Sequence, residues 1–159
     1  MPYPGITFRP IGADDLSFLY QVYASTRLDE IAPLNWPQEQ IDHFLQMQFN
    51  AQHTHYQHHY GHADFDLILL DEQAIGRLYI ERTEDAIHII DIALIPEYRN
   101  RGIGGVLLAD LLDEATTSCK RVQIYVEKFN PALRLYQRLG FRELEDNGVY
   151  YYMEWSPTA

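Results

Sequence analysis

Cysteine, long apolar segments and basic residues are all scarce in this chain. Cys119 is the single cysteine among 159 residues, which excludes an intrachain disulfide. No apolar run is long enough to cross a bilayer, and the start, MPYPGITFRP, lacks the basic and apolar regions of a signal peptide. These absences predict a cytoplasmic protein with no membrane partner.

The shortage of basic residues argues against nucleic acid as the main partner. Only 12 Lys and Arg stand against 23 Asp and Glu, a net charge of −11, whereas phosphate backbones select basic surfaces. Residues 1–98 hold 4 Lys/Arg and 15 Asp/Glu, while residues 99–159 hold 8 of each. Two interpretations stay open: a solvated acidic surface, or a first part that meets a cation and a second part that tolerates an anion.

Hydrophobic residues, by contrast, are plentiful. They make up 47% of the sequence, which predicts one globular domain over residues 1–159. Apolar periodicity predicts the order β-α-α-β-β-β-α-β-α-β-β, an α+β domain with a mixed, mostly antiparallel sheet flanked by helices. The predicted strands are 6–11, 65–71, 74–83, 86–95, 121–128, 140–145 and 149–155, and the predicted helices are 13–26, 38–52, 102–116 and 131–139.

The stretch IALIPEYRNRGIGG carries the strongest functional signal, because a strand there becomes a helix through a turn rich in glycine and arginine. Gly102, Gly104 and Gly105 have no Cβ, so their backbone N–H groups allow a ligand to approach closely. The first N–H groups of a helix lack intrahelical partners, and Arg99 and Arg101 add positive charge. This combination suits a phosphate or pyrophosphate better than a merely tight turn. Neither a Walker A loop nor a G-x-G-x-x-G fingerprint is present.

At these residues the chain resembles the GCN5-related N-acetyltransferase (GNAT) family. The family signature [QR]-x-x-G-x-[GA] is matched from Arg99 to Gly104, and a second family segment is matched by NPALRLYQRLGF, Asn130 to Phe141. The resemblance covers nearly the whole chain and is strongest over residues 87–141. It implies the GNAT fold, with fourth and fifth strands that splay apart to admit acetyl-CoA, and transfer of the acetyl group to an amine.

The resemblance also implies which residues meet acetyl-CoA. Backbone groups late in the fourth strand pair with the pantetheine arm, and those of the turn bind the pyrophosphate. Asn130 takes the place of a family Asn that contacts the cofactor, although it stands six residues before the Tyr rather than seven, and it also suits a helix cap. The implied cofactor-binding residues are Ile92, Ala93, Leu94, Arg99, Asn100, Arg101, Gly102, Ile103, Gly104, Gly105 and Asn130.

Tyr136 takes the place of the family's usual general acid, since a phenol can protonate the departing thiolate. The general base is open between Asp91 and His88. Asp91 lies in an apolar strand, so its charge needs a partner or a shifted pKa. His88 titrates in the useful range. On a regular strand the two face opposite sides, so only one is expected in the site. Glu81 and Glu127 are weaker candidates, and ordered water is a further route.

The run HTHYQHHYGH holds five of the seven histidines, with helical i, i+4 spacing in His55/His59 and His58/His62. A solvated helix end explains this run better than a metal site, and no metal is expected. Trp36, in the loop between the first two predicted helices, is a candidate for lining the acceptor pocket.

The sequence therefore predicts an acetyl-CoA-dependent N-acetyltransferase that acts on a primary amine, as a monomer or homodimer. A catalytically weak acyl-CoA-binding sensor or scaffold with the same fold is the alternative. A nucleotide-binding protein that uses the same turn is a third interpretation. The acidic excess in residues 1–98 favours a small cationic amine or a peptide amine as the acceptor.

Overall fold

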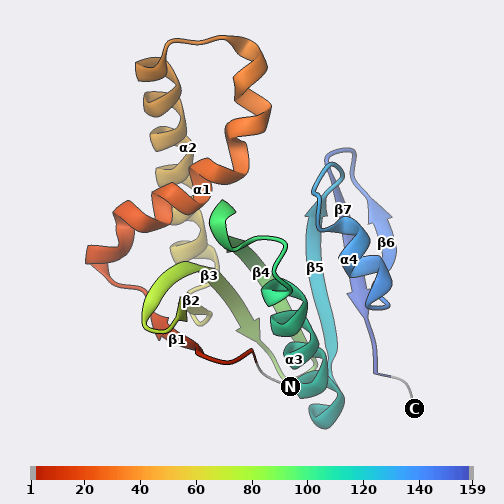
Figure 1. Ribbon diagram of the computed structural model, residues 1–159. Helices are drawn as coiled ribbons and strands as arrows, with labels where there is room; N and C mark the ends of the chain where they lie inside the picture. The colour runs from red at the N-terminus through yellow and green to blue at the C-terminus, as the bar shows by residue number, and fades with distance from the viewer. Residues whose placement is uncertain (1–2, 158–159) are drawn as a thin grey trace.

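A computed structural model describes residues 3–157, which form one seven-stranded mixed sheet with helices on both faces (Figure 1). The strands lie in the order β1-β2-β3-β4-β5-β7-β6. Their bounds are β1 Ile6–Pro10, β2 Asp64–Leu70, β3 Gln73–Arg82, β4 Ala86–Leu94, β5 Arg121–Glu127, β6 Arg142–Asp146 and β7 Tyr150–Trp155. The predicted α+β class and element order are confirmed.

The helices are α1 Leu16–Ile31, α2 Gln38–His59, α3 Ile103–Ser118 and α4 Leu133–Arg138, with short 3-10 turns at Ala13–Asp15, Ala32–Leu34 and Pro96–Tyr98. Helix α2 continues well past the predicted end at residue 52, and its last turns include the first part of the histidine run. Helix α4 is shorter than the predicted 131–139.

Two hydrophobic clusters lie on opposite faces of the sheet. Leu67 and Ile68, neighbours on β2, belong to different clusters, as the alternation of a strand requires. The larger cluster contains residues of strands β2, β3, β4 and β5, the apolar side of α3 and Tyr136 of α4. The smaller one joins β2 to α1 and α2. In Figure 1, α1 and α2 also project beyond the sheet as an antiparallel hairpin.

Strands β4 and β5 run parallel and form the centre of the sheet. Their pairing covers only Ala86–Ile89 of β4 and Arg121–Ile124 of β5. Beyond Ile89 and Ile124 the two strands continue to Leu94 and Glu127 without pairing to each other, and Figure 1 shows them apart. The predicted splay of the central strands is confirmed. No helix within residues 3–157 is long and apolar enough to span a membrane.

Candidate functional site

A β-bulge in β4 lies next to the point where β4 and β5 separate. Tyr79 of β3 pairs with Asp91, while the next residue, Ile80, pairs with Ile89, so Ile90 is the extra residue on β4. A bulge reverses the alternation of side chains from that point onward. Its position decides which side chains of β4 reach the same face of the sheet.

His88 and Asp91 face the same side of the sheet, which corrects the expectation that they point in opposite directions. Asp91 pairs with Tyr79 and His88 pairs with Glu81. Tyr79 and Glu81 are two residues apart on β3 and share a face, so their partners share it as well. Both β4 side chains therefore point toward α2.

Asp91 is held by a buried arginine. The Arg77 Nη2 donates to Asp91 Oδ2 at 2.7 Å and to Gln52 Oε1 at 3.0 Å. Only 3% of the Arg77 side chain and 17% of the Asp91 side chain are exposed. The Tyr56 hydroxyl also donates to Asp91 Oδ2, at 3.3 Å. Because a buried guanidinium requires a counter-charge, the Asp91 side chain is occupied by this pairing.

His88 lies between two tyrosine rings. Its imidazole centroid is 5.7 Å from that of Tyr60 at the end of α2 and 6.0 Å from that of Tyr125 on β5. Burial lowers the pKa of His88 below its ordinary value; Glu81 opposes this shift, and His59 adds to it. A neutral imidazole at the base of the splay is a proton acceptor at neutral pH.

Tyr136 reaches the site from α4 on the other face of the sheet. It is 3% exposed, and its ring packs edge-on against Phe141 at 5.6 Å. Burial first, and then the negative charge of Asp91, raise the pKa of Tyr136 well above its ordinary value. The phenol therefore stays protonated, as a proton donor must.

The turn before α3 is open above its glycines. Asn100 and Gly102 adopt the left-handed conformation, with φ of 61° and 84°, and Gly102 caps the helix. A Cβ placed on Gly102 or Gly104 would meet no atom within 4 Å. The first N–H groups of the 16-residue helix α3 have no partner within the helix, and no side chain at Gly102 or Gly104 hinders the approach of an anion.

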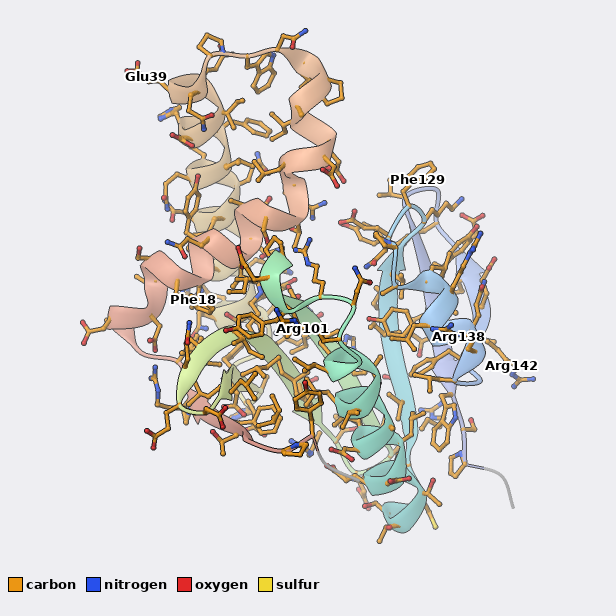
Figure 2. All side chains as sticks on the ribbon, in the orientation of Figure 1. Phe18, Glu39, Arg101, Phe129, Arg138 and Arg142 are labelled. Carbon is orange, nitrogen blue, oxygen red and sulfur yellow. The ribbon has the colours of Figure 1, made fainter. Side chains whose placement is uncertain are left out.

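The two arginines of the turn behave differently. Arg99 braces the turn, since its Nε donates to the Leu94 carbonyl and its Nη2 donates to Ser25 Oγ of α1, both at 2.9 Å. Arg101 lies over the ring of Tyr98, with 5.1 Å from its guanidinium carbon to the ring centroid, and Figure 2 labels it at the turn between β4 and α3.

Asn130 lies in the turn that leads into α4. Its Oδ1 accepts a hydrogen bond from the Ala132 N–H at 2.8 Å, and its carbonyl accepts one from the Leu133 N–H at 3.0 Å. The N-cap residue of α4 is Ala132, with no side-chain capping bond, so the bond from Asn130 stabilises the turn that leads into the helix. Contact between Asn130 and a cofactor stays a prediction.

A cavity of about 320 Å³, called here the distal cavity, lies where β5 ends. The side chains that line it come from α1, from the end of β5 and the loop after it, from the β6–β7 turn and from the start of β7. They are Arg27, Glu30, Glu127, Phe129, Val149 and Tyr150. Sequence reasoning missed this cavity, because α1 and β5 lie about a hundred residues apart.

An ion pair joins α1 to β5 in the distal cavity. Arg27 Nη1 lies 3.0 Å from Glu127 Oε2, and Nη2 lies 2.8 Å from Oε1. This two-point pairing removes Glu127 from the list of free bases. Arg27 also lies over the ring of Tyr23, 5.5 Å from its centroid.

The structure places Trp36 in the α1–α2 hairpin and most of the histidine run in α2. Trp36 packs edge-on against Phe44 at 5.5 Å within the α1–α2 hairpin and does not line the distal cavity. The rings of His55 and His59 stack at 5.1 Å. Among residues 3–157, no group of three or more His, Cys, Asp or Glu side chains is placed to hold a metal ion.

Known proteins share both the fold and the central part of the sequence. The model of the acetyltransferase (GNAT) family matches residues 22–141. The structure of PaiA N-acetyltransferase from Thermoplasma acidophilum in complex with coenzyme A superposes with a TM-score of 0.70 at 19% identity, covering 95% of this chain and 98% of that one.

Two curated proteins match parts of the sequence. Mycothiol acetyltransferase from Corynebacterium aurimucosum is 35% identical over 82 residues, which is 50% of this chain and 23% of that protein. An N-alpha-acetyltransferase from Sulfurisphaera tokodaii is 33% identical over 67 residues, 40% of each chain. The matched regions thus span less than half the length of these relatives. Because the family model covers most of the chain, this protein belongs to the GNAT acetyltransferase family.

Proposed function

We propose that this protein transfers the acetyl group of acetyl-CoA to a primary amine. The observation that supports this most directly is the separation of β4 from β5 beyond Ile89 and Ile124. The bulge at Ile90 lies beside it and directs His88 and Asp91 to one face, while Tyr136 approaches from the other. An acid and a base thus flank the free edges of two strands.

The turn residues fit the diphosphate of acetyl-CoA. The space above Gly102 and Gly104, the helix N-terminus and the neighbouring Arg101 suit a phosphate anion. One edge of Ile92–Leu94 pairs with β3, and the edge toward β5 is free of strand pairing, so the pantetheine arm can take the place of a strand. Arg99 supports the turn through Leu94 and Ser25; as a direct phosphate ligand it stays a prediction.

Acetyl-CoA supplies an activated thioester. The amine nitrogen forms a bond to the thioester carbonyl carbon, and the carbon–sulfur bond breaks. His88 takes the proton that the amine loses, directly or through one water, because its lowered pKa keeps it neutral. Tyr136 gives a proton to the departing sulfur. Asp91 is not the base in this scheme, since Arg77 and Tyr56 already hold its carboxylate.

The acceptor class is a small cationic amine or a peptide amine. The relatives named above as mycothiol acetyltransferase and N-alpha-acetyltransferase are both acetyltransferases, which supports the reaction type. They share only part of their length with this chain, so the argument for the acceptor rests on the acidic excess in residues 1–98.

We also propose that the protein is cytoplasmic and that it is a monomer or a homodimer. The exposed free thiol of Cys119 suits a reducing compartment.

Release of free CoA over a panel of primary amines tests the proposed function, with mass spectrometry of the acetylated product as confirmation. An enzyme releases CoA in proportion to the product. Calorimetric binding of acetyl-CoA without release from any amine would instead identify a binding module. If ATP competes with acetyl-CoA at equal affinity, the turn is a general nucleotide site.

A further inference from the structure

The charges of the distal cavity do not balance. Glu127 takes both terminal nitrogens of Arg27, whereas Glu30 lies 3.4 Å from Arg27 Nη1 and its side chain is 60% exposed. Two carboxylates therefore face one guanidinium, and the less engaged carboxylate is open to solvent. A cation finds a partner in Glu30, while a carboxylate would have to compete with Glu127 for Arg27.

The remaining walls of the distal cavity are apolar and exposed. Phe129 is 96% exposed, Val149 63% and Tyr150 38%. Figure 2 shows Phe129 at the tip of the loop after β5. Exposed apolar side chains that gather at one place mark a binding surface. Phe129 in the loop after β5, Val149 in the β6–β7 turn and Tyr150 at the start of β7 meet at this cavity.

The distal cavity continues the face of β5 that the candidate base faces. His88 is level with Gln123, and Gln123, Tyr125 and Glu127 share one face of β5. At about 3.3 Å per residue, Glu127 lies roughly 7 Å beyond Tyr125 and roughly 13 Å beyond Gln123. A molecule whose amine reacts beside His88 therefore reaches the cavity only with a tail of about this length.

We infer that the acceptor is an amine with a long apolar tail that ends in a second positive charge. The tail lies along β5, its carbon chain covers Phe129 and Val149, and its terminal cation pairs with Glu30. This inference rests on the proposed function, because it concerns the acceptor of the same acetyl transfer. Glu30 and Phe129 act as specificity-determining residues that touch the substrate away from the reacting nitrogen.

Matched acceptors test the inference. 1,8-Diaminooctane, octylamine and 8-aminooctanoate share a primary amine and chain length but end in an ammonium, a methyl and a carboxylate group. Propylamine serves as the short acceptor. The expected order of kcat/KM is diamine, then octylamine, then aminooctanoate, with at least about a tenfold gap between the first and the last. The gap should shrink as ionic strength rises above about 0.15 M.

Substitutions of Glu30 and Phe129 test the charged contact and the apolar contact separately. Glu30→Gln is expected to reduce the preference for the diamine over octylamine by about threefold and to leave octylamine unchanged. Phe129→Ala is expected to lower kcat/KM for both long amines by about fivefold and to leave propylamine unchanged. Leu144→Ala is the matched control, because Leu144 of β6 is also exposed, at 49%, but does not line the distal cavity.

The outcomes distinguish the inference from the function on which it rests. Aminooctanoate as the best long acceptor, equal values for all three tails, or an effect of Phe129→Ala no larger than that of Leu144→Ala would overturn the inference while acetyl transfer stands. A failure to acetylate any amine, propylamine included, would overturn the proposed function and the inference with it.

Discussion

Arg77 of β3 and Asp91 of β4 form a buried ion pair across the strands that lead into the splay, with 2.7 Å between Nη2 and Oδ2. The pair lies next to the bulge at Ile90, so it ties the displaced part of β4 to β3 rather than to β5. It also leaves His88 as the better-placed proton acceptor on that face of the sheet.

Asp91→Asn is expected to lower the free energy of unfolding by about 3 kcal/mol, because it leaves the Arg77 charge buried without a counter-charge. Arg77→Met should lower the free energy of unfolding by a similar amount, because it leaves Asp91 without its partner. The double variant Arg77→Met/Asp91→Asn, which removes both charges, is expected to recover most of the loss. Urea denaturation of the four proteins measures the coupling. Additive losses would show that the two side chains do not stabilise each other.

His88 should give an acid limb to the pH dependence of kcat/KM. Burial lowers the pKa of His88, so the limb is expected at a midpoint below the ordinary value of about 6.5. Activity rises with pH through this limb as the imidazole loses its proton. His88→Gln should remove the limb and lower kcat/KM by about 10²-fold. A limb unchanged in the variant assigns deprotonation to another group or to water.

The same shift in His88 predicts how stability depends on pH. The folded-state pKa is lowered, so between that pKa and about 6.5 the unfolded chain binds more protons than the folded one. The stabilisation is present above the unfolded pKa and is lost as the pH falls through the folded pKa. His88→Gln should flatten this part of a plot of unfolding free energy against pH. His43→Gln, on α2, is a control, and an equal flattening there would contradict the assignment to His88.

Tyr136→Phe is expected to lower kcat by about 10²-fold with little change in acetyl-CoA affinity, because the ring and its packing on Phe141 remain while the proton donor is lost. Because the pKa of Tyr136 is raised, the acid is expected to persist at about pH 10, where an ordinary tyrosine is half deprotonated. Steady-state kinetics and calorimetry measure the two quantities. A kcat within about a factor of two of the original would make Tyr136 a packing residue.

Gly104→Val should weaken acetyl-CoA binding by at least about tenfold, or 1.4 kcal/mol. A Cβ at Gly104 meets no atom within 4 Å apart from its chain neighbours and its own helix backbone, so the expected loss comes from the ligand and not from a clash in the fold. Gly61→Val is the matched control, since a Cβ there also meets nothing within 4 Å and Gly61 lies in the turn after α2. Equal affinities in both variants, measured by calorimetry, would remove the phosphate-binding assignment.

The sequence predicts much of this fold because its signals are local. Alternating and helical apolar patterns identify the elements, and the Gly102–Gly105 turn follows a strand that is apolar on both faces. The family segments at Arg99 and Asn130 predict where acetyl-CoA binds, and this stays a prediction. The predicted end of α2 at residue 52 is wrong, because packing on the sheet extends the helix through a polar histidine run to His59.

The rest depends on contacts that no local pattern encodes. AIHIIDIALI contains no glycine or other residue that marks the bulge at Ile90, so the shared face of His88 and Asp91 was not predictable. Arg77 looks like a solvent-facing charge in an alternating strand, and only the fold brings it to Asp91. The Arg27–Glu127 pair, which lies in the distal cavity, joins residues that are a hundred positions apart, so no local pattern predicts it either.

Two nearby residues of α1 bind different parts of the molecule. Ser25 accepts a hydrogen bond from Arg99 at the glycine turn, and Arg27, two residues later, holds Glu127 at the distal cavity. A displacement of α1 is therefore felt on both sides of the open end of the splay, at β4 and at β5. If a ligand on one side moves α1, thermodynamic linkage requires that each ligand change the affinity of the other by the same factor. A single turn of helix is thus positioned to make the two substrates of a transfer reaction bind cooperatively.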